Sequence, residues 1–483
     1  MFTRRNAVKM LSGAGASLAL TPLAPGLPSA FADSHISPIL ALAKQVAAGG
    51  DVKELTILLP RGSEANVKPV MDVFSAAVGL PMRLVFTNVD EINTRILTDT
   101  LIGANSFDIA LPATFGLPDL VDANALSPLD DLEEKYSSAI GMNASLYTVG
   151  DRFLGKTYGF QTDGDVYLMF YRKSWLEDPK EQARFLKENS TPLRVARNWA
   201  ELDLQIAHFH QPENGKFGGA LFRSPIYLIW EWWVRLHANG SWPVDDNFKP
   251  LVNSPAGVAA LEAIIATQKN LYPEALTNGP VANWKAFAEG NMFCNIGWGG
   301  SQKFFHRAGS PIRNDLVFAP PPGIVADGIE TPMPYFNWGW NYTVARQSKA
   351  REIAYLFARF AVSGEMSTKA IRGSNGFFDP FRPEHYADPE IRKTYSDDFL
   401  TVHRKSMETA IPDFHVRGKG EYFEALRTNL DLAARGVLSA GEALNVAAAQ
   451  WSQITNKLGP AEQARQWRSI KAEYPAPIRK LLS

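Results

Sequence analysis

The chain of 483 residues has one cysteine, Cys294, and a formal net charge of −1. A single cysteine excludes an intramolecular disulfide framework and any metal site built from several cysteines of this chain. The balance of 49 Lys and Arg against 50 Asp and Glu creates no global field that would attract a polyanion. We therefore expect no nucleic-acid partner, and we expect Cys294 to be a buried small hydrophobic residue.

The sequence also lacks the short motifs of common catalytic sites. It has no G-x-S-x-G elbow, no H-E-x-x-H pair, no Walker loop and no G-x-G-x-x-G after a strand. We therefore expect no catalytic residue, no cofactor and no metal site. A pair of carboxylates for glycoside hydrolysis stays open, because the separation of such a pair is spatial and 50 acids single out no pair.

Long apolar runs are absent after the first thirty residues. Arg4, Arg5 and Lys9 precede an apolar run of small residues over 10–24, and Ala30 and Ala32 form an A-x-A cleavage pattern. This order predicts an export signal over residues 1–32, cleaved after Ala32, with a twin-arginine (Tat) signal favoured over a Sec signal or a membrane anchor. We expect an exported, periplasmic product.

The remaining chain reads as a folded α/β protein. Hydrophobic residues make up 46% of the sequence, and the length predicts two to four domains. Short apolar runs at 55–59, 84–87 and 107–111 alternate with helix-like stretches at 65–77 and 91–101. This alternation predicts parallel βαβ units, whose ligands bind at the carboxyl ends of the strands.

Later segments predict a second body. A strand-like run at 166–171 precedes an aromatic helical stretch at 227–237, and another run at 316–319 leads into Pro320 and further prolines. A strand is expected over 340–345, followed by a helix that Ser348 caps and that packs one face. A helical pattern over 421–458 is interrupted by Gly436 and Gly441.

Tryptophan is the clearest compositional signal, with 12 copies. Trp298, Trp338 and Trp340 are flanked by glycine, which gives up packing area and favours close approach to a ligand. Indole rings suit the C–H faces of sugars, and an adjacent Asn341 can pair with hydroxyls. Trp232 and Trp233, in contrast, are more typical of an ordinary core.

Two acids, Asp163 and Asp165, stand just before the strand-like run at 166–171. They are either turn formers, which cap backbone groups with their side chains, or acceptors for the hydroxyls of a ligand.

Six segments together resemble the family 1 extracellular solute-binding proteins, the receptors of ATP-binding-cassette (ABC) importers that include the maltose-binding protein. They are FDIALPATFGLPDLVDANALSPLDDL (107–132), TYGFQTDGDVYLMFYRKSW (157–175), NWAEL (198–202), AFAEGNMFCNIGWGG (286–300), GWNYTVARQSKAREIAYLFARFAVSGE (339–365) and EYFEALRTNLDLAARGVLSAGEALNVAAAQWSQI (421–454). The resemblance implies two α/β lobes joined by crossover strands, with the ligand cleft between them. We expect lobe I over 33–162 and 320–362, and lobe II over 163–319 and 363–483 with the C-terminal helices.

The resemblance also implies which residues bind the ligand. Those expected to face the cleft are Arg61, Ser63, Glu64, Thr114 and Phe115 from lobe I, Asp165 at the first crossover, and Trp230, Glu231, Trp298, Phe423 and Arg427 from lobe II. Asp163, Trp338, Trp340 and Asn341 join this set from the arguments above.

The function implied is reversible capture of a small neutral solute, a sugar, an oligosaccharide or a polyol, by a monomer that delivers it to an ABC permease. Two alternatives stay open: an exported, Tat-dependent enzyme that acts on a glycoside, and the same binding fold with an amino acid or polyamine as solute.

Overall fold

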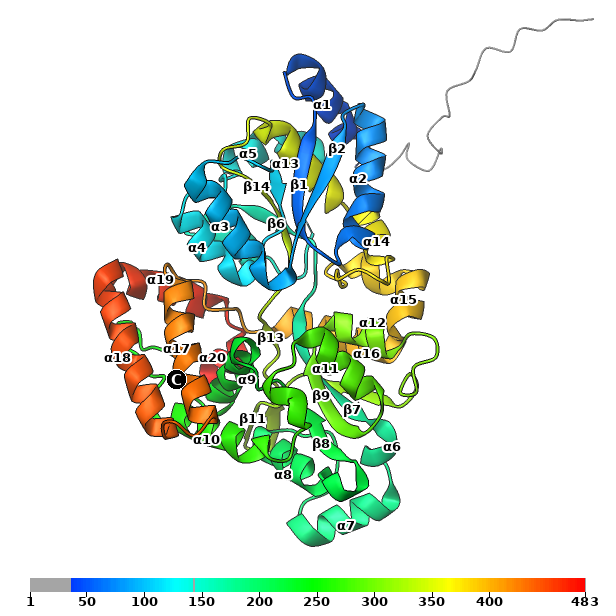
Figure 1. The fold of residues 1–483 in the computed structure, drawn as a ribbon. Helices are drawn as coiled ribbons and strands as arrows, with labels where there is room; N and C mark the ends of the chain where they lie inside the picture. The colour runs from blue at the N-terminus through cyan, green and yellow to red at the C-terminus, as the bar shows by residue number, and fades with distance from the viewer. Residues whose placement is uncertain (1–35, 142–143, 483) are drawn as a thin grey trace, which may run out of the picture.

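Two separate β-sheets form the centres of two α/β lobes, which lie one above the other in Figure 1. The structure is a computed structural model that describes residues 36–141 and 144–482. The expected export signal over 1–32 lies outside the described residues. None of the helices within them is long and apolar enough to cross a lipid bilayer.

The first lobe is built on a five-stranded sheet. Its strand order is β2 (Met82–Thr87), β1 (Leu55–Pro60), β3 (Ile109–Ala110), β14 (Asn341–Val344) and β6 (Gly159–Gln161). The first three strands are parallel, and β14 runs antiparallel to both its neighbours. All six residues of β1 are buried, as expected for a central strand with both faces covered.

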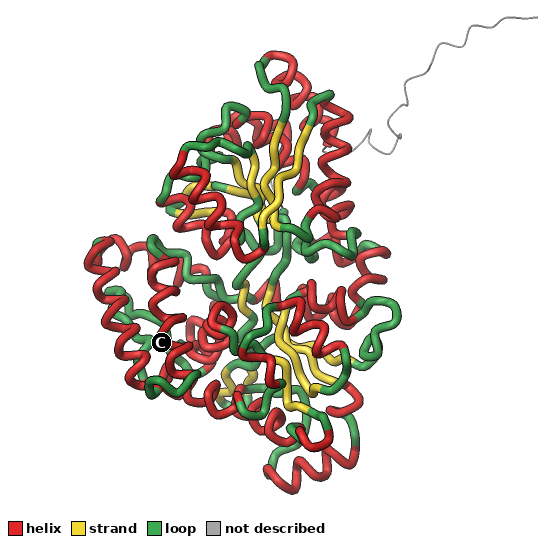
Figure 2. The backbone as a smooth tube through the Cα atoms, in the orientation of Figure 1, coloured by secondary structure: helices red, strands yellow, loops and turns green. Residues whose placement is uncertain are grey.

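The helices of this lobe cover the two faces of that sheet (Figure 2). They are α1 (Ile36–Gly49), α2 (Glu64–Val78), η2 (Val89–Glu91), α3 (Ile92–Ile102), η3 (Thr114–Gly116), α4 (Leu117–Asp122), α5 (Asp130–Ile140), η4 (Val149–Asp151), α13 (Arg351–Ala361) and α14 (Gly364–Ile371), with a small hairpin of β4 (Arg152–Phe153) and β5 (Lys156–Thr157). Helix α13 is buried over all of residues 353–361, not on one face, because α1, α2 and β14 all pack against it. Ser348 accepts from the backbone N–H of Ala350, but the helix begins only at Arg351.

The second lobe has a mostly antiparallel sheet around β7. Its strand order is β10 (Leu316–Ala319), β7 (Val166–Arg172), β9 (Met292–Gly297) and β8 (Phe217–Ala220), and β13 (Tyr335–Phe336) also pairs with β7. Strands β8 and β9 are parallel, and Cys294 lies buried on β9 as expected.

The helices of the second lobe that surround these strands come from the stretches of chain between the strands and from the stretch after them. They are α6 (Lys173–Leu176), α7 (Pro179–Asn189), α8 (Trp199–Phe209), η5 (Pro212–Asn214), α9 (Pro225–Ala238), α10 (Pro255–Gln268), η6 (Pro273–Leu276), α11 (Pro280–Ala288), α12 (Gly299–Phe305), η7 (Pro383–Ala387), α15 (Pro389–Tyr395) and α16 (Asp397–Thr409), with a hairpin of β11 (Ile324–Ala326) and β12 (Ile329–Thr331).

The C-terminal helices are α17 (Lys419–Ala434), α18 (Ala440–Leu458), α19 (Pro460–Glu473) and α20 (Ala476–Leu481). Helices α17 and α18 pack on each other and on α10, and α17 also packs on α9. They form the orange and red bundle beside the second sheet in Figure 1. Gly436, in a left-handed conformation with φ of 73°, lies in the break between α17 and α18, whereas Gly441 lies inside α18.

Within residues 36–141 and 144–482, the chain crosses between the lobes three times. Residues 162–165 join β6 to β7, residues 337–340 join β13 to β14, and residues 372–388 join α14 to α15. The pairing differs from the expected division at 320 and 362, because β13 still pairs with β7 and α14 packs on α2 of the first lobe.

Candidate functional site

The three crossovers lie side by side between the lobes. The backbone N–H of Thr162 donates to the carbonyl of Trp340 at 2.9 Å, and that of Gly164 donates to the carbonyl of Asp379 at 3.1 Å. Each crossover is therefore held by another, and side chains from all three can face one space.

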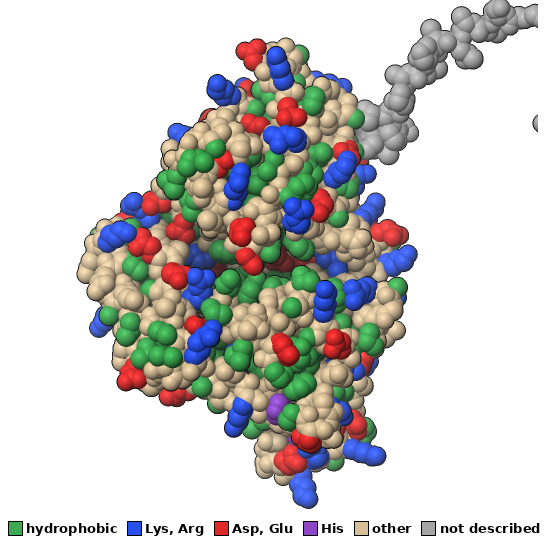
Figure 3. All heavy atoms as spheres, in the orientation of Figure 1, with side chains coloured by type: hydrophobic (Ala, Val, Ile, Leu, Met, Phe, Trp, Pro, Cys, Tyr) green, Lys and Arg blue, Asp and Glu red, His purple; other side chains and the backbone are tan. Residues whose placement is uncertain are grey.

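That space is a cavity of about 90 Å³ between the lobes. Its lining residues are Val89 from the first lobe, Asp165, Trp338, Trp340 and Phe377 from the crossovers, and Tyr227, Pro280, Val281, Trp284, Trp298 and Gly300 from the second lobe. Asp165 is the one carboxylate among them, and most of the wall is aromatic. Figure 3 shows the recess between the two lobes as a dark hollow.

Trp298 lies at the start of α12, directly after β9, and is 5% exposed. Its indole Nε1 donates to Oδ1 of Asn337 at 2.9 Å, which ties the second lobe to the second crossover. The glycines beside it are packed against other side chains: a Cβ at Gly299 would come within 2.4 Å of the Asp379 carboxyl, and one at Gly300, which also lines the cavity, within 3.2 Å of the Trp284 ring. Gly299 permits the close approach of another side chain, whereas the expected contact between a glycine and the ligand stays a prediction for Gly300.

Among the aromatic rings that Trp338 packs against, Tyr227 and Trp298 line the same cavity and Trp230 does not. Trp338 lies 5.3 Å from Trp230, 6.2 Å from Trp298 and 6.3 Å from Tyr227 between ring centroids. The buried indole nitrogens of Trp230, Trp284, Trp338 and Trp340 find no hydrogen-bond acceptor among the described residues. These donors are buried among the rings and are not exposed on the wall, which is almost entirely apolar apart from Asp165.

A cluster of three carboxyl groups adjoins the cavity. One oxygen each of Asp163, Asp165 and Asp379 lies within 4.8 Å of the others. Asp379 Oδ1 accepts from the Tyr395 hydroxyl at 2.5 Å and lies 3.1 Å from the Lys303 ammonium. Asp163 is fully buried and accepts the backbone N–H of Asp379 at 2.6 Å, so it supports the cluster from behind and only Asp165 lines the cavity.

Burial changes the protonation of this cluster. Burial first, and then the charge of Asp379, raise the pKa of Asp163 to about 8. Burial and the charges of both neighbours raise the pKa of Asp165 well above its ordinary range. Near pH 7 the cluster therefore holds at least one proton.

A second, larger cavity of about 270 Å³ lies beyond Trp230 and Trp338. Phe115, Phe423 and Arg427, all expected at the ligand site, line this compartment and not the first one. Lys419 also lines it, forms a buried ion pair with Asp413, and places its ammonium 4.6 Å from the centre of the Phe423 ring.

The lobes touch each other near both cavities. The Tyr227 hydroxyl donates to Asp90 Oδ1 at 3.0 Å, and the backbone N–H of Gly420 donates to Asp119 Oδ2 at 2.9 Å. Arg417 Nε lies 2.6 Å from Asp122 Oδ1. These contacts join α9 and the start of α17 to the first lobe, so the arrangement is a closed one.

Replacing Tyr227 by phenylalanine removes one of these closing contacts. We expect ligand affinity to fall about fivefold, because a hydrogen bond of about 1 kcal/mol stabilises the closed form alone. Calorimetric titration measures this change. Tyr422→Phe, which removes a hydroxyl that contacts Thr455 within the C-terminal bundle, should leave affinity within twofold.

Closure should also depend on pH through Asp119. Burial is the main reason that the pKa of this carboxyl is raised to about 6. Lys419 and the Gly420 N–H lower the pKa, and the charges of Asp122 and Glu421 raise it. With the lobes apart the carboxyl is in water and has an ordinary pKa, so the closed form takes up a proton first and closure is favoured as pH falls from 7 to 5. Asp119→Asn should flatten this part of the profile of affinity against pH.

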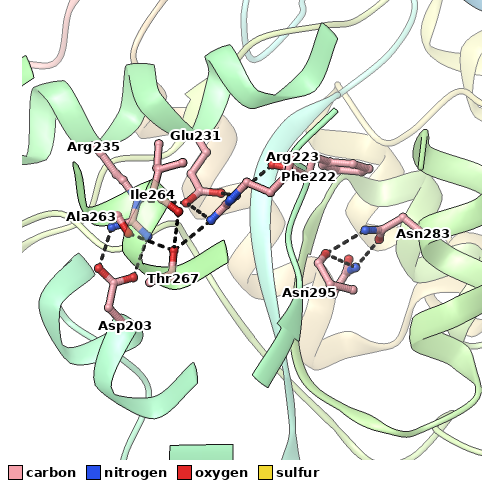
Figure 4. Close-up of polar contacts among 11 residues, drawn as sticks. Asp203, Phe222, Arg223, Glu231, Arg235, Ala263, Ile264, Thr267, Asn283 and Asn295 are labelled. Carbon is pink, nitrogen blue, oxygen red and sulfur yellow. Dashed lines mark hydrogen bonds and ion pairs between the residues drawn. The ribbon is translucent and has the colours of Figure 1, made fainter. Parts of the chain in front are cut away.

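Glu231 does not belong to the ligand site. Its carboxylate lies 2.5 Å from Arg223 Nη1 and 2.9 Å from Arg235 Nε, and Arg235 also pairs with Asp203, all inside the second lobe (Figure 4). Successive helical residues point about 100° apart. Trp230 therefore faces the second cavity while Glu231 faces the interior of the lobe.

Two further expected residues, Asn341 and Thr114, hold the structure around the site. Asn341 is buried on β14 and donates to the carbonyl of Gly150 at 2.7 Å and to Asp151 at 2.9 Å. Alternation along the strand directs it away from the side on which Trp340 lies. Thr114 donates its hydroxyl to the Trp338 carbonyl and so fixes the second crossover.

The loop after β1 does not line either cavity. Arg61 is exposed and stacks over Phe86, Ser63 is buried where α2 begins, and Glu64 accepts the backbone N–H of Gly62 at 2.6 Å. The residues that the sequence reasoning missed are Tyr227, Trp284, Phe377, Asp379 and Lys303. Trp284 was visible as part of the tryptophan signal, and the two phenylalanines beside Asp379 in a glycine-rich loop were a further signal.

Comparisons with known proteins bear on this architecture. An ABC transporter solute-binding protein from Agrobacterium vitis S4 with bound D-mannitol is 18% identical, with a TM-score of 0.67 over 84% of this chain and 99% of that one. One from Agrobacterium radiobacter K84 in complex with ribitol is 15% identical, with a TM-score of 0.70 over 83% and 98%. Maltose-bound MalE3 of T. maritima is 17% identical, with a TM-score of 0.69 over 83% and 99%.

These structures share the two-lobed fold of this chain. A search of curated proteins gave no match. Residues 70–396, more than half of the chain, match the family of bacterial extracellular solute-binding proteins, and the protein belongs to that family.

Proposed function

We propose that this protein is the solute receptor of an ABC importer and that it captures a sugar, an oligosaccharide or a polyol by lobe closure. The family and the fold support the role of receptor, and the similar structures hold mannitol, ribitol and maltose. Delivery to a permease and action as a periplasmic monomer belong to the same proposal.

The cavity at the three crossovers is the observation that carries the proposal. It combines aromatic faces, which suit the C–H faces of a sugar, with Asp165, which can pair with hydroxyls. Closure would bury the solute between groups from both lobes, and only the closed form would offer all of them together.

The energy required is modest. Micromolar binding corresponds to about 8 kcal/mol. For a hexose of about 12 heavy atoms this is roughly 0.7 kcal/mol per atom, below the ceiling of about 1.5 kcal/mol. Stacking and paired hydroxyls can supply it without any chemical step.

A panel of sugars, oligosaccharides and polyols tests the proposal. Tryptophans line the cavity, so quenching of intrinsic fluorescence and a shift in unfolding temperature should both report binding, and titration calorimetry gives the affinity. The absence of any change across the whole panel would contradict the proposal. Chromatography of the recovered solute separates capture from conversion, since a receptor returns it unchanged.

A further inference from the structure

A recess of about 690 Å³ adjoins the cavity at the crossovers. Val281, Trp284, Gly300 and Phe377 line both spaces. The other walls of the recess come from α12 and the loop after it, from the third crossover and from α15. A solute held in the cavity can therefore reach into the recess.

The recess is strongly basic, although the formal net charge of the whole chain is −1. Its one carboxylate is that of Glu390, and its Lys and Arg side chains are Lys303, Arg307, Arg313, Arg372 and Lys393. His306 is the other titratable group on the wall, and its Nδ1 lies 3.0 Å from the Thr394 carbonyl. Figure 3 shows blue Lys and Arg side chains around the right-hand end of the hollow between the lobes. A concave surface with charge of one sign concentrates ions of the opposite sign.

Most of this positive charge is not neutralised within the protein. Lys303 pairs with Asp379, and Arg372 pairs with Asp388. The cations of the recess that form no ion pair with a carboxylate of residues 36–141 or 144–482 are Arg307, Arg313 and Lys393. All three are exposed, so their charge is available to a ligand.

The Arg307 guanidinium is positioned by an aromatic ring and not by an acid. Its central carbon lies 3.8 Å from the centre of the Phe304 ring, and that ring lies 6.2 Å from Trp284 between centroids. Stacking of this kind leaves the N–H edges of a guanidinium free to bind two oxygens of a carboxylate or a phosphate. Aromatic rings thus lead from the cavity wall, at Trp284, to an arginine that is set to bind an anion.

We propose that the solute is an acidic saccharide, with a sugar ring in the cavity and a carboxylate, phosphate or sulfate group against Arg307 in the recess. Arg313 and Lys393 supply further positive charge. Asp165 lines the cavity and not the recess, so it meets the hydroxyls of the solute and not its negative group. The inference rests on the proposed receptor function and replaces the expected neutral solute by a negatively charged one.

The shape of the basic surface favours a solute over a membrane. A membrane with anionic lipids is a broad surface and would contact cations that project from the protein. The cations described above line a hollow that shares four wall residues with the cavity. A small molecule that spans both spaces fits this arrangement.

Matched pairs of probes test the proposal. The pairs are D-glucuronate with D-glucose, D-galacturonate with D-galactose, D-glucose 6-phosphate with D-glucose, and cellobiouronate with cellobiose. At low salt we expect the acid of at least one pair to bind at least tenfold more tightly than its neutral partner in calorimetric titrations. This preference should shrink as the ionic strength rises from about 0.01 M to about 0.15 M, whereas the affinity for the neutral partner should not change.

Variants of the exposed cations assign the preference to the recess. Arg307→Gln should reduce it at least fivefold, and the combined replacement of Arg307, Arg313 and Lys393 by glutamine should reduce it to within twofold. Affinity for the neutral partner should stay within twofold in both variants, which a merely structural role would not allow. The control is Arg346→Gln, at an exposed arginine of the first lobe that lines neither the recess nor either cavity, and it should keep the full preference.

Each failure has its own signature. Equal or tighter binding of every neutral partner, or a preference that the triple variant keeps, would overturn the inference. So would inorganic phosphate that binds as tightly as D-glucose 6-phosphate, because the recess would then hold an anion without a sugar. Binding to phosphatidylglycerol vesicles that Arg307→Gln weakens, without any preference among the sugars, would assign the recess to a membrane surface instead.

The receptor function can survive the failure of this inference. If neutral sugars of the panel bind and no acidic sugar does, the receptor function stands and the acidic solute falls. If no carbohydrate of either kind binds, both fall.

Discussion

Replacing Trp298 by leucine is expected to weaken solute binding at least 30-fold, or about 2 kcal/mol. The indole lines the cavity and its Nε1 holds Asn337 of the second crossover, so the variant loses a wall of the site and a tie between lobe and crossover. Titration calorimetry with the tightest solute of the panel measures the loss.

The control for this variant is another buried tryptophan. Trp451 is fully buried in the C-terminal bundle and donates to the Tyr422 carbonyl at 2.7 Å, away from both cavities. We expect Trp451→Leu and Trp298→Leu to lower the free energy of unfolding by similar amounts, about 2–3 kcal/mol. Only Trp451→Leu should leave the affinity unchanged. If the two variants lose affinity equally, Trp298 acts through stability and not through contact with the solute.

Glu231→Ala is expected to lower the free energy of unfolding by about 3–5 kcal/mol, the largest stability effect in this chain that we anticipate. It would leave the guanidinium of Arg223 buried without a carboxylate, and Arg235 with Asp203 alone. Glu231→Gln, which keeps part of the hydrogen bonding, should fall between the wild type and Glu231→Ala. Urea denaturation measures all three proteins.

An exposed ion pair provides the comparison for Glu231. Asp72 pairs with Lys68 one turn away on the surface of α2, and Asp72→Ala should cost less than about 1 kcal/mol. A loss for Glu231→Ala as small as this would mean that the buried arginines are hydrated, contrary to the closed network in Figure 4.

Local elements could be predicted because their signals are local. The run at 55–59 matches β1, and the helical spacing at 65–77 matches α2, since burial on one or both faces leaves a period in the sequence. The two-lobed architecture followed from the order of the family segments and is confirmed by the structures that share the fold.

The site was only partly predictable, for a spatial reason. Asp165 and the tryptophans could be named because of their type and their neighbours. Asp379 could not, because it joins Asp163 across 216 positions of the chain. Glu231 was wrongly expected at the ligand site because it directly follows Trp230 in the sequence. The helix turns successive side chains about 100° apart, so the two residues face different sides.

The location of the cavity on the crossovers has a consequence for how the empty receptor recognises its solute. The three segments that join the lobes are the same ones that carry Asp165, Trp338, Trp340 and Phe377. The solute therefore contacts the connections between the lobes and not only the rigid body of one lobe. We expect selectivity to depend on the three crossovers, because a solute that does not fit between them would prevent the lobes from closing.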